Sequence, residues 1–262
     1  MTAHHIRFDV DAAGVGTITI DRPEKRNAMT YAMLGAFIEA IGKAGEDDRV
    51  RVLIVTGAGG AFCAGTDLAD LATVPGETRG VRGRSDQHDV WWPLVACPKP
   101  VIGAIDGYAV GMGAEFTSQC DVRIVTDRAR FAWNFAQRGL VPDTGAGSWL
   151  LPRLIGPSRA LRLLYSAGFL EAAEAKAIGY ANEVVAPEAL MDTARAEAER
   201  YLACSPFSLR RMKQLVWQGL ERDVASHMAA HVEALSACFK SEDHKEGVAA
   251  FLERRPAKFV GR

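Results

Sequence analysis

Apolar and polar positions follow two different periods in the first part of the chain. Residues 15–23, VGTITIDRP, alternate like a half-buried strand that ends at a proline. Residues 27–47 then space their apolar side chains as an amphipathic helix does. Further strands, each running into a turn or loop, are predicted within residues 50–68, 100–116 and 121–133. Strands that recur with helices between them predict an α/β fold.

Two other parts of the chain lack this strand pattern. Residues 74–89 are polar and glycine-rich, which predicts a mobile surface loop. From about Pro187 onward only helical spacing is found, and helices are predicted at 188–205, 207–224, 226–241 and 243–256. Helices this rich in apolar residues must pack on the body of the fold or on another subunit. We therefore predict a core of residues 1–200 and a helical oligomerisation region of residues 201–262.

Composition and charge exclude several classes of protein. The chain has 262 residues, of which 48% are apolar and 24% charged, so a sizeable core can form. The net charge is −1 without a basic block, which gives no indication of nucleic-acid binding. Five cysteines stand singly, as expected for reduced thiols. There is no signal-peptide pattern and no apolar run near the roughly 20 residues that span a bilayer. We expect a cytoplasmic protein that does not bind membranes.

Two glycine runs and one histidine pair come close to known motifs but lack part of each pattern. Residues 57–59 and 111–113 follow strands, yet phenylalanine stands where a dinucleotide fingerprint has its third glycine. His227 and His231 are spaced like zinc ligands on a helix, but Met228 replaces the glutamate of a zinc protease. The glycines are therefore predicted to form turns, and no metal site is expected.

Those turns have a chemical use of their own. FCAGTDL (62–68) and AVGMGAE (109–115) each present backbone N–H groups where small residues permit close approach, and two such donors can stabilise one oxyanion. The second turn opens a helix, whose N-terminus adds its dipole. Glu115 lies in the first turn of that helix, where an acidic residue often only satisfies the dipole or the capping groups. Taken alone, Glu115 would be assigned to that structural role rather than to catalysis.

The motifs taken together resemble the crotonase, or enoyl-CoA hydratase/isomerase, superfamily. RPEKRNAM, AFCAGTDL, KPVIGAIDGYAVGMGAE and GLVPDTGAGSWLLPRLIGPSRAL occur in this order, followed by HKEGVAAFLERRPAKF at the end. The resemblance implies a crotonase fold of repeated ββα units in a spiral, with C-terminal helices that build a homotrimer or a dimer of trimers. It also implies an acyl-CoA thioester substrate, in which coenzyme A is part of the substrate, and no metal or redox cofactor.

The resemblance implies roles for single residues as well. Thr66 and Met112 match the two backbone N–H donors of the oxyanion hole, and Met112 replaces a usual glycine. Glu115 matches the first of two family glutamates. Lys25 and Arg26 match a basic position that tends to meet CoA phosphates, and Ala64 matches a backbone contact to the adenine. The tail that often closes a neighbouring subunit's CoA site contains Phe251, Lys258 and Phe259.

The chain departs from the hydratase pattern at two positions. The second glutamate of hydratases follows F-x-x-P, and Phe135 stands in its place, at the substrate site. Adding water needs a base for the water and an acid for the α-carbon, whereas isomerisation only moves a proton between carbons. Asp143 stands where hydratases usually have glycine, and an acid here resembles several double-bond isomerases. Asp143 is equally well explained as the N-cap of the following helix.

These departures favour isomerase-like chemistry over efficient hydration. Phe135 would help to exclude water, while Glu115 and Asp143 would share the proton transfers. Near this apolar wall, at least one of the two carboxyl groups is expected to have a raised pKa. The alternatives are an acyl-CoA thioester hydrolase, which would use the same oxyanion hole, and a non-catalytic acyl-CoA binding protein.

Overall fold

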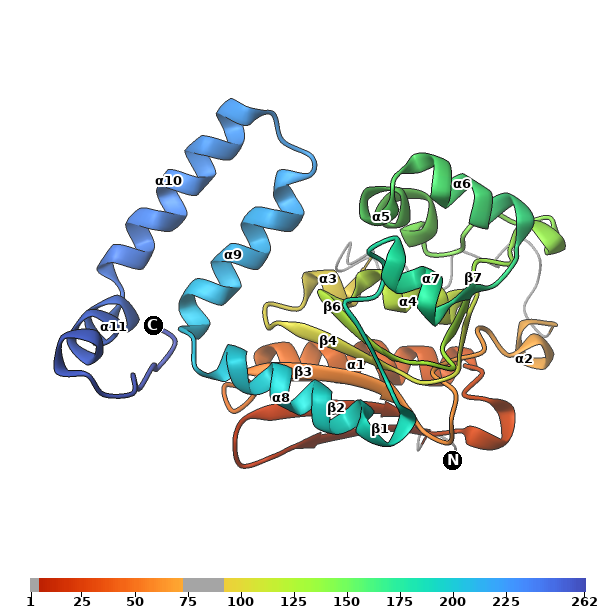
Figure 1. Cartoon of the computed structure of the whole chain (residues 1–262), viewed down its shortest axis with the longest axis horizontal. Helices are drawn as coiled ribbons and strands as arrows, with labels where there is room; N and C mark the ends of the chain where they lie inside the picture. The colour runs from red at the N-terminus through yellow and green to blue at the C-terminus, as the bar shows by residue number, and fades with distance from the viewer. Residues whose placement is uncertain (1–4, 73–91) are drawn as a thin grey trace.

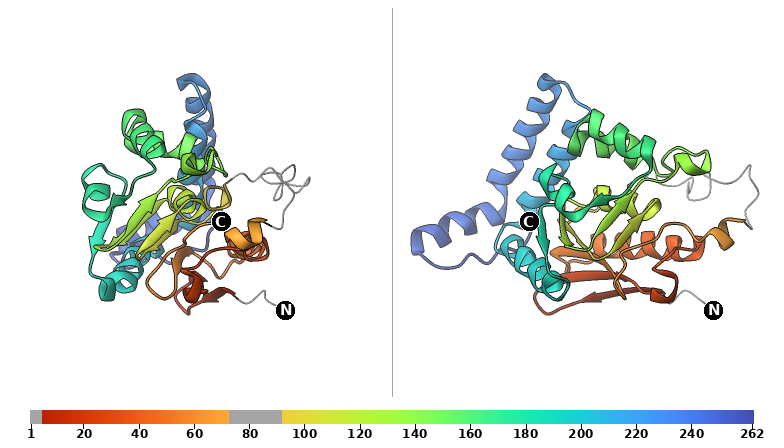
Figure 2. Two further views of the ribbon diagram at one scale, coloured as in Figure 1. Left: turned by 90° about the vertical axis from the view of Figure 1, so that its right-hand side faces the viewer. Right: turned by 45° about the vertical axis from the view of Figure 1, so that its right-hand side comes forward.

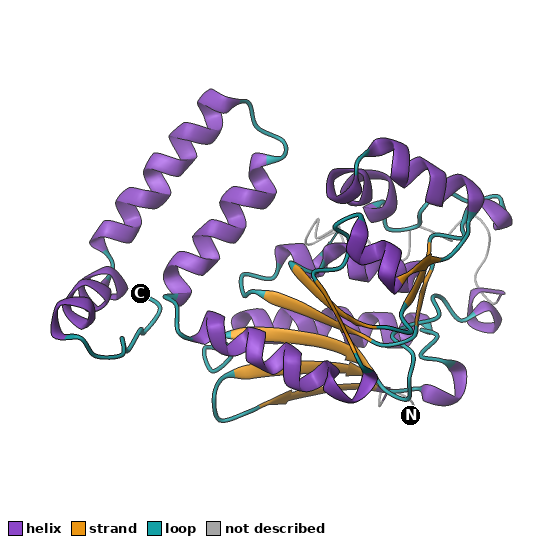
Figure 3. Ribbon diagram, viewed as in Figure 1, coloured by secondary structure: helices purple, strands orange, loops and turns teal. Residues whose placement is uncertain are grey.

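The computed structural model describes residues 5–72 and 92–262, so the predicted loop at 74–89 lies outside the described part. Two sheets carry the strands (Figures 1 and 3). The larger sheet has the order β1-β2-β3-β4-β6-β9 and the smaller sheet the order β5-β7-β8. The larger sheet consists of β1 (Ile6–Val10), β2 (Val15–Ile20), β3 (Val52–Gly57), β4 (Val101–Ile105), β6 (Val122–Thr126) and β9 (Glu183–Val185). The smaller sheet consists of β5 (Tyr108–Val110), β7 (Arg130–Ala132) and β8 (Leu170–Glu171).

The larger sheet is mostly parallel and is covered on both faces. Only β1 pairs antiparallel with its neighbour, whereas β2, β3, β4, β6 and β9 pair in parallel. Leu53 and Val55 of β3 belong to a core that includes helix α1 (Tyr31–Glu46). Val52 and Ile54 belong to a second core with helix α8 (Leu190–Leu202). Alternate side chains of one strand therefore enter opposite cores, as the strand period of two requires.

Pairs of strands followed by a helix repeat along the chain. β4 of the larger sheet leads into β5 of the smaller one and then into helix α4 (Met112–Gln119). β6 and β7 divide between the sheets in the same way, and a 3₁₀ turn η4 (Ala136–Arg138) then leads to α5 (Ala146–Ile155). The predicted α/β class with repeated ββα units is confirmed.

Shorter helices complete the body of the fold. They are η2 (Pro23–Lys25), α2 (Leu68–Ala72), α3 (Pro93–Ala96), α6 (Pro157–Ser166), α7 (Ala172–Ala177) and η5 (Pro187–Ala189). Among the described residues, no helix is long and apolar enough to cross a bilayer. The same residues contain no group of three or more His, Cys, Asp or Glu side chains that could share a metal ion.

The last three helices project from the body as an arm (Figures 1 and 2). They are α9 (Pro206–Gly219), α10 (Val224–Lys240) and α11 (Glu242–Glu253), and together with α8 they confirm the four C-terminal helices predicted from the sequence. Lys213 Nζ pairs with Asp121 Oδ2 at 2.8 Å, and Trp217 Nε1 donates to Asp121 Oδ1 at 3.0 Å. These contacts fasten α9 to the body, yet no residue of α9 or α10 is buried in the described chain.

Candidate active site

Glu115 lies in the first turn of α4 but does not cap this helix. The N-cap is Gly111, whose φ of 53° is a conformation that favours glycine, and no side chain caps the helix start. The Glu115 side chain is fully buried, and its Oε2 accepts a hydrogen bond of 2.6 Å from Thr144 Oγ1. Because its carboxyl group is directed to another loop, the capping interpretation of Glu115 is wrong.

The two glycine-containing turns pack directly against each other. Val110 N donates to Cys63 O at 2.9 Å, which joins the turn before α4 to the turn after β3. A methyl group at Gly65 would come within 2.8 Å of Val110 O, and one at Gly113 would collide with Cys63 O. Only glycine permits this approach of two backbones, so the tertiary contact explains the small residues in both motifs.

The contact brings the two proposed oxyanion donors to the same place. A Cβ atom at Gly65, the residue before Thr66, would lie 3.7 Å from Met112 N. In the described part of the chain, the N–H groups of Thr66 and Met112 have no protein acceptor. Met112 is 4% exposed and packs in the main core. Two free amides at a helix N-terminus can hold one anionic oxygen.

Phe135 and Asp143 come from the segment that links β7 to α5. A methyl group at Gly111 would lie 3.9 Å from Phe135 Cζ, so the phenyl ring lies against the turn that carries Met112. Helix α5 has Gly145 as its N-cap, with no side-chain capping bond. The alternative that Asp143 is the N-cap of this helix is therefore wrong. Its side chain remains accessible to solvent.

Burial raises the proton affinity of Glu115, and partial desolvation acts in the same direction on Asp143. Burial raises the pKa of Glu115 to about 8, assisted by the negative charge of Asp143 and opposed by the Thr144 hydroxyl. The surrounding protein also raises the pKa of Asp143 to about 6, although solvent reaches this residue. The expectation of a raised pKa is confirmed for both groups. At neutral pH Asp143 is mainly ionised and Glu115 mainly protonated, so one can accept a proton while the other donates one.

Two further residues, Thr144 and Gly147, shape this site and were not recognised in the sequence. Thr144 holds Oε2 of Glu115, whereas Oε1 is buried and has no partner among the described residues. A methyl group at Gly147 would collide with Oε1 and lie 2.8 Å from Trp133 Cδ1. The Nε1 atom of Trp133 is also buried without a partner. Thr144 and Gly147 lie in the PDTGAG segment. Its small residues are the feature of the sequence that could have pointed to these two positions.

The predicted CoA-binding residues lie on a loop beside the turn after β3. Lys25 and Arg26 are exposed, and the Arg26 guanidinium lies 5.5 Å from the centre of the Tyr108 ring. Ala64 N donates to Arg26 O at 3.0 Å, so the basic loop and the oxyanion turn are joined. Among the described residues, the Lys25 side chain makes no hydrogen bond or ion pair that would compete with a phosphate.

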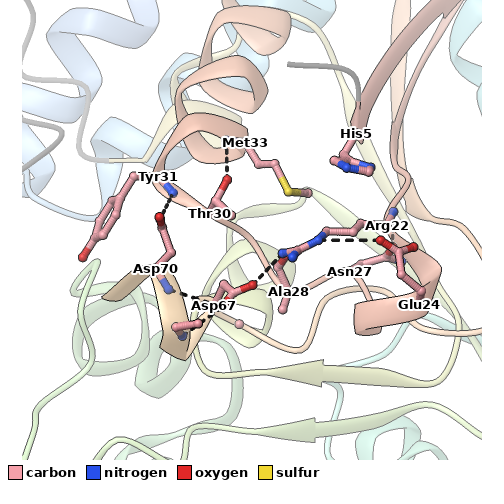
Figure 4. A network of polar contacts seen from close by, with 12 residues as sticks. His5, Arg22, Glu24, Asn27, Ala28, Thr30, Tyr31, Met33, Asp67 and Asp70 are labelled. Atoms are coloured by element: carbon pink, nitrogen blue, oxygen red, sulfur yellow. Dashed lines mark hydrogen bonds and ion pairs between the residues drawn. The ribbon is translucent and has the colours of Figure 1, made fainter. Parts of the chain in front are cut away.

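An internal ion pair holds this loop in place (Figure 4). Arg22 Nη1 donates to Asp67 Oδ2 at 2.7 Å and to Ala28 O at 3.0 Å. Asn27 Nδ2 donates to Ala61 O at 2.6 Å, and Asp70 Oδ2 accepts from the backbone N–H of Tyr31 at 2.7 Å. Arg22 and Asp67 are both largely buried, which makes the pair a positional link between the RP and AGTD motifs rather than a solvated surface contact.

The tail residues are not brought to Glu115 of the same chain. Figure 1 shows the C-terminus at the far end of the molecule from α4. Asp243 Oδ1 accepts hydrogen bonds from Val260 N at 2.8 Å and Gly261 N at 3.0 Å, which folds the tail back on α11. The predicted role of the tail at a neighbouring subunit stays a prediction, and it concerns Phe251, Lys258 and Phe259.

The fold thus brings two backbone N–H groups without a described protein acceptor close to the buried carboxyl group of Glu115. The family described as enoyl-CoA hydratase/isomerase matches residues 11–262. Crotonyl-CoA hydratase of Syntrophomonas wolfei is 35% identical over 252 residues, which cover 95% of both chains. The 1,2-epoxyphenylacetyl-CoA isomerase of Escherichia coli is 36% identical over 253 residues, or 95% of this chain and 96% of the relative.

The solved structures agree with these relatives. The crystal structure of enoyl-CoA hydratase from Bacillus anthracis has a TM-score of 0.92 at 31% identity, and the match covers 99% of this chain and 100% of the other. The chain belongs to the enoyl-CoA hydratase/isomerase family of the crotonase superfamily. The predicted crotonase fold is thereby confirmed, together with an enzyme of the hydratase/isomerase type that acts on acyl-CoA.

Proposed function

We propose that this enzyme moves a double bond in an acyl-CoA by proton transfer and that it is a poor hydratase. The observation that carries the proposal is the pairing of Glu115 and Asp143 beside the oxyanion turn, with the phenyl ring of Phe135 against the same turn. The relatives include one named 1,2-epoxyphenylacetyl-CoA isomerase as well as named hydratases, so both types of activity occur among them. Phe135 is 7% exposed and offers no base that could activate a water molecule.

The proposed reaction begins with the thioester oxygen at the two free amides. Hydrogen bonds from Thr66 N–H and Met112 N–H stabilise the negative charge that the carbonyl oxygen gains in the enolate. Ionised Asp143 removes a proton from the γ-carbon of a 2-enoyl thioester, and the released electron pair forms the β,γ double bond. Protonated Glu115 delivers its proton to the α-carbon. Exchange with solvent then restores both carboxyl groups, and the reverse reaction uses the opposite protonation states.

Substrate binding and assembly are part of the same proposal. Lys25 and Arg26 are proposed to bind the CoA phosphates, with Ala64 at the adenine. The arm is proposed to form the contacts of a homotrimer or a dimer of trimers, which would bring each tail to a neighbouring site. Support comes from a series of exposed apolar side chains along α9 and α10, too extensive to leave in water. They are Met212, Val216, Leu220, Val224, Met228, Val232, Leu235 and Phe239.

Product analysis with a panel of 2-enoyl-, 3-enoyl- and saturated acyl-CoAs in D₂O tests the proposal. We expect isomerised enoyl-CoA with deuterium at the α-carbon, because different groups remove and deliver the proton. Glu115→Gln and Asp143→Asn should each lower the isomerisation rate by about 10²–10⁴, the usual contribution of a positioned acid or base. Fast hydration by the unmodified enzyme, undiminished in Asp143→Asn, would contradict the proposal. Free CoA as the main product would indicate a hydrolase. Binding of acyl-CoA without deuterium exchange at the α-carbon would indicate a non-catalytic protein.

A further inference from the structure

Trp92 connects the start of α3 to the loop that carries Asp143 and Thr144. Its Nε1 donates a hydrogen bond of 3.0 Å to the backbone carbonyl of Thr144. Its ring lies 5.1 Å from that of Trp149, at an interplanar angle of 35°. The Arg153 guanidinium covers the Trp149 ring at 3.6 Å. Trp92 is thus held by one directional bond and one stacked ring, both to the segment around the α5 N-terminus.

The hydroxyl group of Thr144 extends this connection to Glu115. Thr144 Oγ1 donates to Glu115 Oε2 at 2.6 Å and accepts from Ala146 N at 3.3 Å. A threonine hydroxyl has a single proton to donate, and here that proton is used on Oε2. Oε1, the other oxygen of Glu115, is buried without a hydrogen-bond partner among the described residues. The position of Thr144 therefore fixes the orientation of the Glu115 carboxyl group.

We propose that Trp92 is a positioning residue that orients both carboxyl groups through Thr144. Asp143 precedes Thr144 in the chain, so a bond that fixes the Thr144 carbonyl also fixes the peptide next to Asp143. The inference rests on the proposed proton-transfer function, since Trp92 touches Glu115 only through Thr144. Its effect is on the geometry of the reacting groups, to which proton-transfer rates are steeply sensitive.

The test compares Trp92→Phe with Trp217→Phe. Both substitutions remove one indole N–H that donates at 3.0 Å from a half-buried ring, but Trp217 donates to Asp121 at the base of the arm. A phenyl ring at 92 keeps the stacking on Trp149 and removes only the bond to Thr144. We expect Trp92→Phe to lower kcat about five- to tenfold, the effect of one neutral hydrogen bond, with little change in KM. Trp217→Phe should leave kcat unchanged.

Two further measurements separate positioning from simple stability. In a Thr144→Val background, Trp92→Phe should have no additional effect on kcat, because the route to Glu115 is already removed. Carboxyl ¹³C NMR, assigned with Glu115→Gln, should show a higher pKa for Glu115 in Trp92→Phe, since the Thr144 hydrogen bond stabilises the charged form. Thr144→Ser keeps the hydroxyl and should retain the wild-type pKa.

Three outcomes would overturn the inference. They are equal kcat values for the two tryptophan variants at equal thermal stability, additive effects of Trp92→Phe and Thr144→Val, and an unchanged pKa of Glu115 in Trp92→Phe. The NMR titration needs no turnover. If the unmodified enzyme catalyses no α-proton exchange, the proposed function fails, while the titration still decides whether Trp92 orients Glu115.

Discussion

Replacing Glu115 by glutamine should change how the stability of the protein depends on pH. Glutamine has nearly the same shape, stays neutral at every pH, and keeps a side-chain oxygen that can accept from Thr144. In the wild type, the buried carboxyl group must either hold a proton or place a charge in the interior. The difference in unfolding free energy between the two proteins therefore reports mainly the protonation of Glu115.

The structure gives both the direction and the size of the effect. The pKa of Glu115 is about 8 in the folded protein, against an ordinary value of 4.5 when the chain is unfolded. The folded state thus binds the proton more tightly, and this contribution to stability is complete below pH 4.5. It is lost progressively as the pH rises to about 8. At about 1.36 kcal/mol per pH unit, the wild type should lose about 5 kcal/mol relative to Glu115→Gln across this interval.

Urea unfolding followed by circular dichroism, at five pH values from 4.5 to 8.5, measures this difference. Both proteins should be compared at one subunit concentration, because assembly stabilises folded subunits by mass action. Asp143 titrates in both proteins, so its contribution largely cancels. The quantity to follow is the unfolding free energy of the wild type minus that of Glu115→Gln. If this difference stays constant within about 1 kcal/mol, or rises with pH, the assignment of Glu115 as a buried neutral acid at neutral pH is refuted.

Three other changes test the rest of the site. Phe135→Glu should raise the ratio of 3-hydroxyacyl-CoA to isomerised enoyl-CoA, measured by chromatography, because it restores the glutamate that hydratases have at this position; an unchanged ratio would contradict the role of the phenyl ring. Gly147→Ala should lower kcat by about 10²-fold, because the methyl group displaces Oε1 of Glu115. Replacing Lys25 and Arg26 together by alanine should weaken CoA binding in calorimetry most strongly at low salt, and a loss of affinity independent of salt would argue against phosphate contacts.

Local features of the fold could be predicted from the sequence because they depend on neighbours along the chain. Period-two alternation in residues 15–23 was sufficient to predict strand β2, and helical spacing after Pro187 was sufficient to predict the helices of the arm. The GMG turn predicted the start of α4, and hence the place of Glu115, because a strand that enters glycines must turn there. The ordered set of motifs was sufficient to predict the family, and the match to the family over residues 11–262 confirms this prediction.

The protonation state and the partners of the carboxyl groups were decided only by the tertiary structure. Thr144 is 29 residues from Glu115 in the chain, and Trp92 is 52 residues from Thr144, so no local pattern relates them. The sequence left Asp143 between catalysis and capping, and the backbone excluded capping by placing Gly145 at the N-cap of α5. A raised pKa requires the removal of water from around a carboxyl group, which happens only when distant segments close around it.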